Sequence, residues 1–181
     1  MEYPCYIDSA FPRAADLLSR ALCSVYATPR KPPVLLCIGT DRATGDSLGP
    51  LVGHLLKQKK VCKDGGIALY GDLEQPIHAK NITEELEVIR RIHENPLIVA
   101  IDASLGKSAQ IGFLKVGKGP ISPGAAAKRP LPPVGDLHIT GIVNFGGAME
   151  LMVLQNTRLN IVMKMASVIS EGLDLWLKSS Y

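Results

Sequence analysis

The stretch VLLCIGTDRATGDSLGPLV, residues 34–52, predicts a buried strand, a polar loop and the start of a helix. The apolar run stops at Gly39, and the helix is expected to begin near Ser47 or the residue after it. In an open α/β sheet, the loops that follow the carboxyl ends of the strands collect ligands and catalytic groups. This loop carries two carboxylates, Asp41 and Asp46, which makes it the first candidate for a functional site.

Length and composition indicate one globular domain. The 181 residues are enough for a single domain with its own core, and 46% of them are hydrophobic. A net charge of +3 is too small for a nucleic-acid footprint, so no nucleic-acid partner is expected. No apolar run approaches the about 18 residues of a membrane span, and the N-terminus does not have the pattern of a signal peptide. Four cysteines without a CxxC pair favour reduced thiols, so we expect a cytoplasmic protein away from membranes.

Apolar periodicity predicts a succession of helices and strands along the whole chain. Residues 1–8 are expected to be a loose lead-in to a helix that begins at Asp8 or Ser9, within an N-terminal helical region 1–30. Further helices are expected to about Lys60, over 81–94 with a capping box from Asn81 to Glu84, and after Asn156 or Thr157, with Leu159, Val162, Met163, Ala166, Ile169, Leu173 and Trp176 on its packed face. Strands are expected over 67–70, 97–101, 112–116 and, for an ambiguous apolar run, 149–154.

Two continuous apolar strands with helices between them predict a mostly parallel sheet that is covered on both faces. The strongest strand, 97–101, is expected to end at Asp102. The segment 117–135 holds five prolines and several glycines, which predicts a long loop or lid over the site. We therefore expect a single α/β domain over residues 1–181.

Three polar residues stand at comparable places in this predicted fold. Asp46 follows the first core strand, Asp102 ends the strongest one, and His138 lies just beyond the proline-rich segment. Two carboxylates in one cleft can separate their pKa values and activate a water molecule as base and acid. Two carboxylates and an imidazole can alternatively hold a divalent metal. Each residue also has a structural alternative, because Asp caps helices and turns and a lone His often belongs to the core.

The letters Gly-Asp-Ser-Leu at 45–48 match the signature of the GDSL esterases. In that family the serine directly follows the first strand, and an Asp-x-x-His pair lies near the C-terminus. Here the serine lies far down the loop, and the candidate pair of Asp136 and His138 is one residue short. A nucleophilic Ser47 is therefore a minor hypothesis.

The blocks CIGTDRATGDSLGP and IVAIDASLG resemble two blocks of the spore germination protease. With HITGIVN and VLQNTRLNIVMKMA, the chain resembles the short sporulation proteins related to that protease, over roughly residues 34–170. The resemblance implies a three-layer α/β fold shared with the hydrogenase maturation endopeptidases. It also implies an atypical aspartic-type site made of Asp46 and Asp102. In the hydrogenase-maturation relatives, positions that correspond to Asp46, Asp102 and His138 bind the nickel of the substrate.

We therefore expect a sporulation-associated, peptidase-like protein of the cytoplasm whose substrate is a protein or peptide. Asp46 and Asp102 would activate water for peptide hydrolysis, and His138 would orient a carboxylate or complete a divalent metal site. Two alternatives stay open at this point. One is a regulatory protein that binds a peptide or partner on the same fold without catalysis, and the other is a metal-dependent hydrolase of a small molecule. The sequence is compatible with an oligomer.

Overall fold

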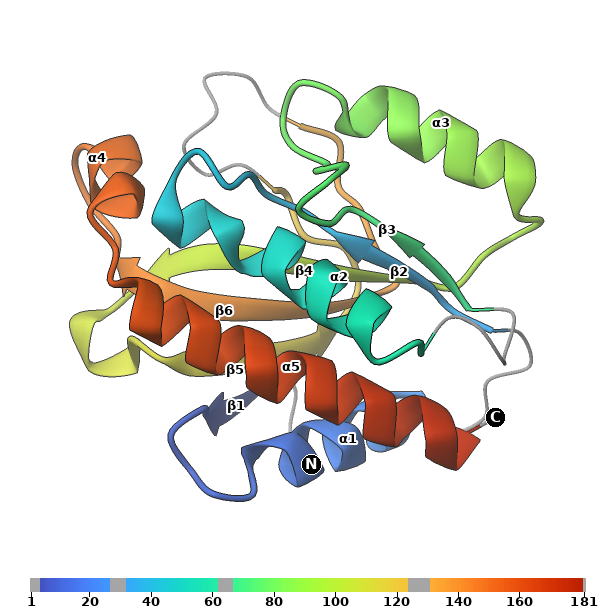
Figure 1. The fold of residues 1–181 in the computed structure, drawn as a ribbon, viewed down its shortest axis with the longest axis horizontal. Helices are drawn as coiled ribbons and strands as arrows, with labels where there is room; N and C mark the ends of the chain where they lie inside the picture. The colour runs from blue at the N-terminus through green and yellow to red at the C-terminus, as the bar shows by residue number, and fades with distance from the viewer. Residues whose placement is uncertain (1–3, 27–31, 62–66, 124–130, 181) are drawn as a thin grey trace.

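The computed structural model of the chain describes residues 4–26, 32–61, 67–123 and 131–180. Within these ranges, six strands form one sheet in the order β1-β5-β6-β4-β2-β3 (Figure 1). The strands are β1 (Cys5–Asp8), β2 (Val34–Cys37), β3 (Ala68–Tyr70), β4 (Ile98–Gly106), β5 (Phe113–Lys118) and β6 (Leu137–Phe145). The helices are α1 (Ala14–Val25), α2 (Leu48–Gln58), α3 (Ile82–Ile92), α4 (Glu150–Gln155) and α5 (Leu159–Ser180), with 3-10 turns η1 (Thr44–Ser47) and η2 (Ser108–Gln110).

The sheet is mostly parallel, as the sequence predicted. The four strands β3, β2, β4 and β6 run parallel to one another, whereas β5 pairs antiparallel with both β6 and β1. Strands β2 and β4 are buried on both faces over most of their length, which explains why they read as continuous apolar runs.

Helices cover both faces of the sheet and give the expected three layers. α1, α2 and α5 pack together on one face, where they bury the larger apolar cluster (Figure 1). α3 covers the other face through Ile82, Leu86 and Ile89, which recur at helical spacing. These three side chains belong to the second cluster, with Leu36 of β2 and Ala100 of β4.

The chain reverses its winding between the neighbouring strands β2 and β4. From β2 it runs through α2 outward to β3, and from β4 it continues toward β5 and β6 on the other side. Such a topological switch point opens a crevice at the carboxyl ends of the two strands. The loop that carries Asp46 leaves β2 at this point, and Asp102 lies in β4 beside it.

The N-terminal prediction was wrong in two respects. Residues 5–8 form an edge strand that pairs with β5, where the sequence predicted a loose lead-in. A four-residue strand is too short to show a period of its own, and it is fixed by pairing with a strand about a hundred residues later in the chain. α1 begins at Ala14 without a side-chain cap, because the Asp8 carboxylate accepts the backbone N–H of Ala10 within a turn.

Two element boundaries and one element type also differ from the expectation. β4 does not end at Asp102 but continues to Gly106, because β6 runs alongside it over the same length. Residues 117 and 118, expected to start the loop, complete β5. The run 149–154, assigned to a strand, forms the short helix α4. It is tied in place by the Asn144 side chain, which donates to the Val153 carbonyl at 3.3 Å and to the Thr157 hydroxyl at 3.2 Å.

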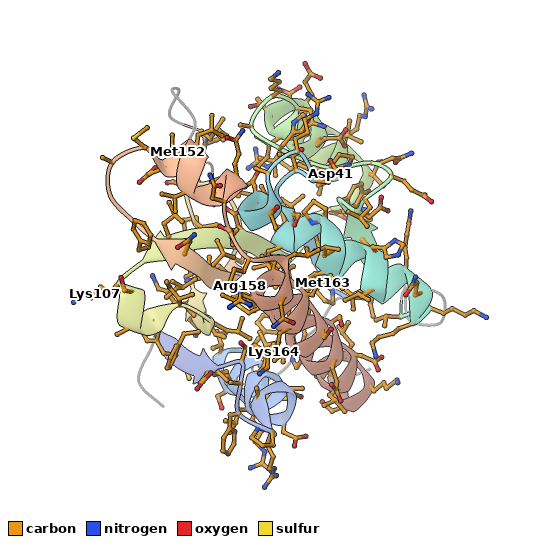
Figure 2. All side chains as sticks on the ribbon, turned by 60° about the vertical axis from the view of Figure 1, so that its left-hand side comes forward. Asp41, Lys107, Met152, Arg158, Met163 and Lys164 are labelled. Carbon is orange, nitrogen blue, oxygen red and sulfur yellow. The ribbon has the colours of Figure 1, made fainter. Side chains whose placement is uncertain are left out.

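The expected helix caps are absent. The Asn81 side chain accepts the His78 N–H instead of capping α3, and no side chain caps that helix. The Thr157 hydroxyl donates back to Val153, and α5 starts at Leu159. On α5, Leu159 and Met163 are 56% and 38% exposed, so two residues of the predicted packed face point outward, whereas the rest of that face is buried. Figure 2 shows Met163 and Met152 of α4 as exposed side chains on one side of the molecule.

In the described ranges, none of the helices combines the length and apolar character that crossing a membrane requires.

Candidate active site

Asp46 is held at the carboxyl end of β2 by a loop that folds back on itself. The Thr40 N–H donates both to the Asp46 carbonyl, at 3.0 Å, and to its side-chain Oδ2, at 3.1 Å. Gly39 makes this closure possible, since its φ is +138° and a Cβ there would lie 2.0 Å from the Asp46 carbonyl oxygen. Gly49 similarly lets the first turn of α2 rest on β2, because its Cβ would lie 2.1 Å from the Ile38 carbonyl oxygen. Both positions thus require glycine for a turn or a close approach of the backbone.

Asp102 comes from the neighbouring strand and is 6% exposed. Cys37, the last residue of β2, pairs with Ile101, so Asp102 lies level with the first residue beyond β2. β4 also contacts η1, the turn that contains Asp46. One backbone donor, the Ala103 N–H, reaches the Asp102 Oδ1 at 2.8 Å. The structure thus brings the two predicted carboxyl groups to the same point of the sheet.

The surroundings shift the pKa values of both carboxyl groups upward. Burial raises the pKa of Asp46 to about 6, and the hydrogen bond from the Thr40 N–H opposes this rise. The pKa of Asp102 lies well above its usual range, because the group is buried and because the negative charge of Asp46 is nearby; the Ala103 N–H again opposes the rise. Asp46 therefore ionises first, and its charge helps to keep the proton on Asp102. The pair is thus arranged so that Asp46 can carry the charge while Asp102 holds a proton.

A groove of about 500 Å³ starts at Asp102 and crosses the sheet face that α1, α2 and α5 leave uncovered. Its lining mixes polar and apolar surface, and its polar side chains besides Asp102 are those of Tyr6, Ser104, Gln110, Lys115, Ser122, His138, Thr140 and Glu150. Pro120, Ile121 and Ser122 form one wall. They belong to the expected lid 117–135, and Ile121 forms an isolated bridge with Val134. The central part of that segment, residues 124–130, lies outside the described ranges.

His138 lines the groove but does not contact the carboxylate pair. Its Nδ1 lies 3.0 Å from the Gly119 carbonyl oxygen, which can only accept, so Nδ1 carries the proton. The ring leans over Gly117 of β5, whose Cβ would lie 2.7 Å from the imidazole. In the part of the chain that the structure describes, His138 forms no ion pair with Asp46 or Asp102, and its Nε2 has no hydrogen-bond partner. It does not orient a carboxylate in this structure.

The residues do not fit the expected metal site. Among the described residues, no three His, Cys, Asp or Glu side chains lie together in a way that could hold a metal ion. Asp46, Asp102 and His138 therefore do not form a three-residue metal centre here. His138 is separated from the pair because it lies level with Ala100, two residues before Asp102 along the strand.

Ser47 is not placed as a nucleophile. Its hydroxyl donates to the Thr44 carbonyl at 2.6 Å, and the residue is 6% exposed at the end of η1. The bond closes the turn that leads into α2, which is an ordinary structural use of serine.

Sequence reasoning missed the groove residues beyond the predicted triad. Ser104, Lys115, Thr140 and Tyr6 lie on the same sheet face as Asp102, in segments that were predicted as loop, lead-in or plain strand. The sequence signal that could have found these residues is the alternation of side chains between the two faces of a strand. Asp102 and Ser104, and likewise His138 and Thr140, stand two residues apart, which places each pair on one face once the strands are known to continue.

The switch-point crevice, the helices on both faces and the paired carboxyl groups define an α/β protein with the fold of a hydrogenase maturation protease. The crystal structure of the [NiFe] hydrogenase maturation protease HycI from Thermococcus kodakarensis KOD1 matches with a TM-score of 0.54 and 16% sequence identity. The match covers 90% of this chain and 99% of that chain. At this identity the match shows the fold alone.

The chain belongs to the family described as "Protein of unknown function (DUF1256)", which it matches over residues 6–172. It is 53% identical over 145 residues to the "Uncharacterized protein YyaC" of Bacillus subtilis (strain 168). That alignment covers 80% of this chain and 69% of YyaC. None of these names refers to sporulation, so the link to spore proteins and to the germination protease stays a prediction.

Proposed function

We propose that the protein is a peptidase that hydrolyses a peptide bond with Asp46 and Asp102. The observation that carries the proposal is the pair of carboxyl groups at the switch point of the sheet, of which Asp102 is buried and Asp46 partly buried. Burial raises both pKa values, and the Asp46 charge raises that of Asp102 further. Buried carboxyl pairs of this kind are typical of acid–base sites rather than of helix caps. The fold of a maturation protease supports the same class of reaction.

The two carboxyl groups have different roles in this proposal. The Asp46 carboxylate takes a proton from a water molecule while the water oxygen bonds to the scissile carbonyl carbon. Asp102, still protonated, gives its proton to the carbonyl oxygen, where negative charge would otherwise develop, and takes the proton back when the carbonyl re-forms. When the carbon–nitrogen bond breaks, the proton on Asp46 passes to the leaving amine. One water molecule is consumed, and both groups return to their starting state.

The substrate of this reaction is a protein or peptide, because the groove that starts at Asp102 extends across neighbouring strands and offers polar side chains along its length. The resemblance to the germination protease supports a role in spore formation or germination, in the cytoplasm of the spore-forming cell. Small acid-soluble spore proteins are therefore the first substrates to examine.

The test compares purified wild-type protein with Asp46→Asn and Asp102→Asn. Each is incubated with small acid-soluble spore proteins and, separately, with a randomised peptide mixture, and the fragments are identified by mass spectrometry. We expect cleavage at defined bonds by the wild type and none by either variant, with the far-UV circular dichroism unchanged. Asp41→Asn, an exposed position of the same loop, serves as the control that keeps activity. An Asp102→Asn protein that still cleaves would contradict the mechanism, and wild-type binding without cleavage would favour the regulatory alternative.

A further inference from the structure

Four side chains form a straight row across the floor of the groove. Asp102 of β4 pairs in register with Thr140 of β6, Thr140 with Lys115 of β5, and Lys115 with Tyr6 of β1. Residues paired in register point to the same face of a sheet. All four residues line the groove. The row therefore leads away from the carboxylate pair in one direction, strand by strand.

The three members beyond Asp102 all carry hydrogen-bond donors. They present the Thr140 hydroxyl, the Lys115 ammonium and the Tyr6 phenol. In the described ranges, none of these three side chains takes part in a hydrogen bond or an ion pair. Thr140 is 7% exposed, Lys115 is partly buried and Tyr6 is 46% exposed, so the donors progress from the buried end of the groove to its open end.

Lys115 is the one cation among the described residues of the groove lining. The lining also contains Glu150, at the start of α4, but the structure forms no ion pair between Glu150 and Lys115 among the described residues. A partly buried ammonium with neighbouring hydroxyl donors and no anionic partner is suited to an oxygen acceptor that carries negative charge.

The spacing of the strands sets the distance from the reaction centre to this cation. Neighbouring strands lie about 4.8 Å apart, so Lys115 is about 10 Å from Asp102, measured across the sheet. An extended peptide advances about 3.3 Å per residue and covers that distance in about three residues.

We propose that Lys115, flanked by Thr140 and Tyr6, binds a carboxylate of the peptide about three residues from the bond that Asp46 and Asp102 attack. The inference rests on the proposed peptidase function and names the class of substrate: a peptide with an acidic side chain, or with its own C-terminal carboxylate, at that position. The row of donors orients the peptide across the strands, and the carboxylate fixes which bond reaches the carboxyl pair.

The experiment measures binding and cleavage separately. Immobilised wild-type protein is equilibrated with two mixtures of short randomised peptides, one with free C-terminal carboxylates and one with amidated C-termini. Bound peptides and released fragments are both identified by mass spectrometry. Lys115→Gln and Lys115→Glu are compared with Lys118→Glu, which reverses a charge on the same strand at an exposed position outside the groove lining.

If the carboxylate comes from a side chain, wild-type protein and Lys118→Glu should enrich Asp or Glu at one position of the amidated peptides. If it is the C-terminal carboxylate, both proteins should retain peptides with free C-termini over amidated ones. Lys115→Gln should weaken the preference about tenfold, the usual effect of one charge-assisted contact, and Lys115→Glu should favour Lys or Arg instead. No acidic preference, no bound peptide, or the same preference in Lys115→Glu would overturn the inference. Acidic peptides bound without cleavage would overturn the peptidase function only, and cleavage without acidic preference would overturn this inference only.

Discussion

Replacing Asp46 by Asn is expected to stabilise the protein at neutral pH and to leave its stability nearly unchanged at low pH. The pKa of Asp46 is raised from an ordinary value of 3.8 to about 6, so the folded state holds this proton more tightly than the unfolded state does. The free energy of unfolding therefore falls as the pH rises from about 4 through about 6, because the folded protein must then carry a buried charge. The substituted amide has no such charge, and it keeps an oxygen that can accept the Thr40 N–H.

The size of this effect follows from the pKa difference. One pKa unit corresponds to 1.36 kcal/mol, so the difference between 3.8 and about 6 corresponds to about 3 kcal/mol. The advantage of Asp46→Asn over wild type should grow from near zero below pH 4 to about 3 kcal/mol above pH 7. Such a gain is a large fraction of the about 5–15 kcal/mol that stabilises an ordinary domain.

Urea unfolding of wild type and variant at a series of pH values measures this difference. The single tryptophan, Trp176, is fully buried in α5 and provides a fluorescence signal for unfolding. Titrating groups away from the pair are common to both proteins, so their effects cancel, whereas Asp102 loses the part of its raised pKa that the Asp46 charge causes. Asp41→Asn removes an exposed carboxyl group from the same loop and should shift stability little at any pH. A difference between Asp46→Asn and wild type that stays constant from pH 4 to pH 7.5 would refute the argument that Asp46 ionises in a desolvated position.

Three other results are expected. Asp102→Asn should lose all hydrolysis yet retain the far-UV circular dichroism of the wild type, and a variant that still hydrolyses peptide would remove Asp102 from the mechanism. The rate of hydrolysis should rise as the pH passes about 6, where Asp46 loses its proton, and fall at higher pH as Asp102 loses its own; a rate that is flat from pH 5 to 7 would exclude Asp46 as the base. Gly49→Ala should lower the free energy of unfolding by about 2 kcal/mol or more, since its Cβ would meet the Ile38 backbone, whereas Gly146→Ala, with ordinary contacts only, should be nearly neutral in the same urea titration.

The parallel core was predictable because its signals are local. The run 34–38 ends at a glycine with positive φ, and the carboxyl group of Asp46 follows at the start of a helix. Once β2 and β4 are recognised as buried parallel strands, their carboxyl ends must meet, which brings Asp46 and Asp102 together. These inferences need only the chemistry of a few consecutive residues and one rule of sheet topology.

The elements that were missed depend on partners far away in the sequence. β1 is a strand only because β5 is available to pair with it, and the continuation of β4 to Gly106 depends on β6 beside it. The ambiguous run 149–154 folds as a helix that the Asn144 side chain anchors from β6. His138 was expected just beyond the proline-rich segment, but no strand was predicted there, so its place along β6 relative to the carboxyl pair could not be read from the sequence.

The pairing of β1 with β5 divides the molecule into parts of unequal local stability. The carboxyl pair is held by strands in the middle of the sheet, whereas Tyr6 belongs to a four-residue edge strand that is joined to the sheet along one side only. Short edge strands open more readily than central ones, so amide hydrogen exchange should be faster in the edge strands β1 and β3 than in β2 and β4. The outer end of the groove can therefore open while the strands that hold the carboxyl pair stay folded, and a peptide bound across β5 and β1, as proposed, should slow exchange in β1.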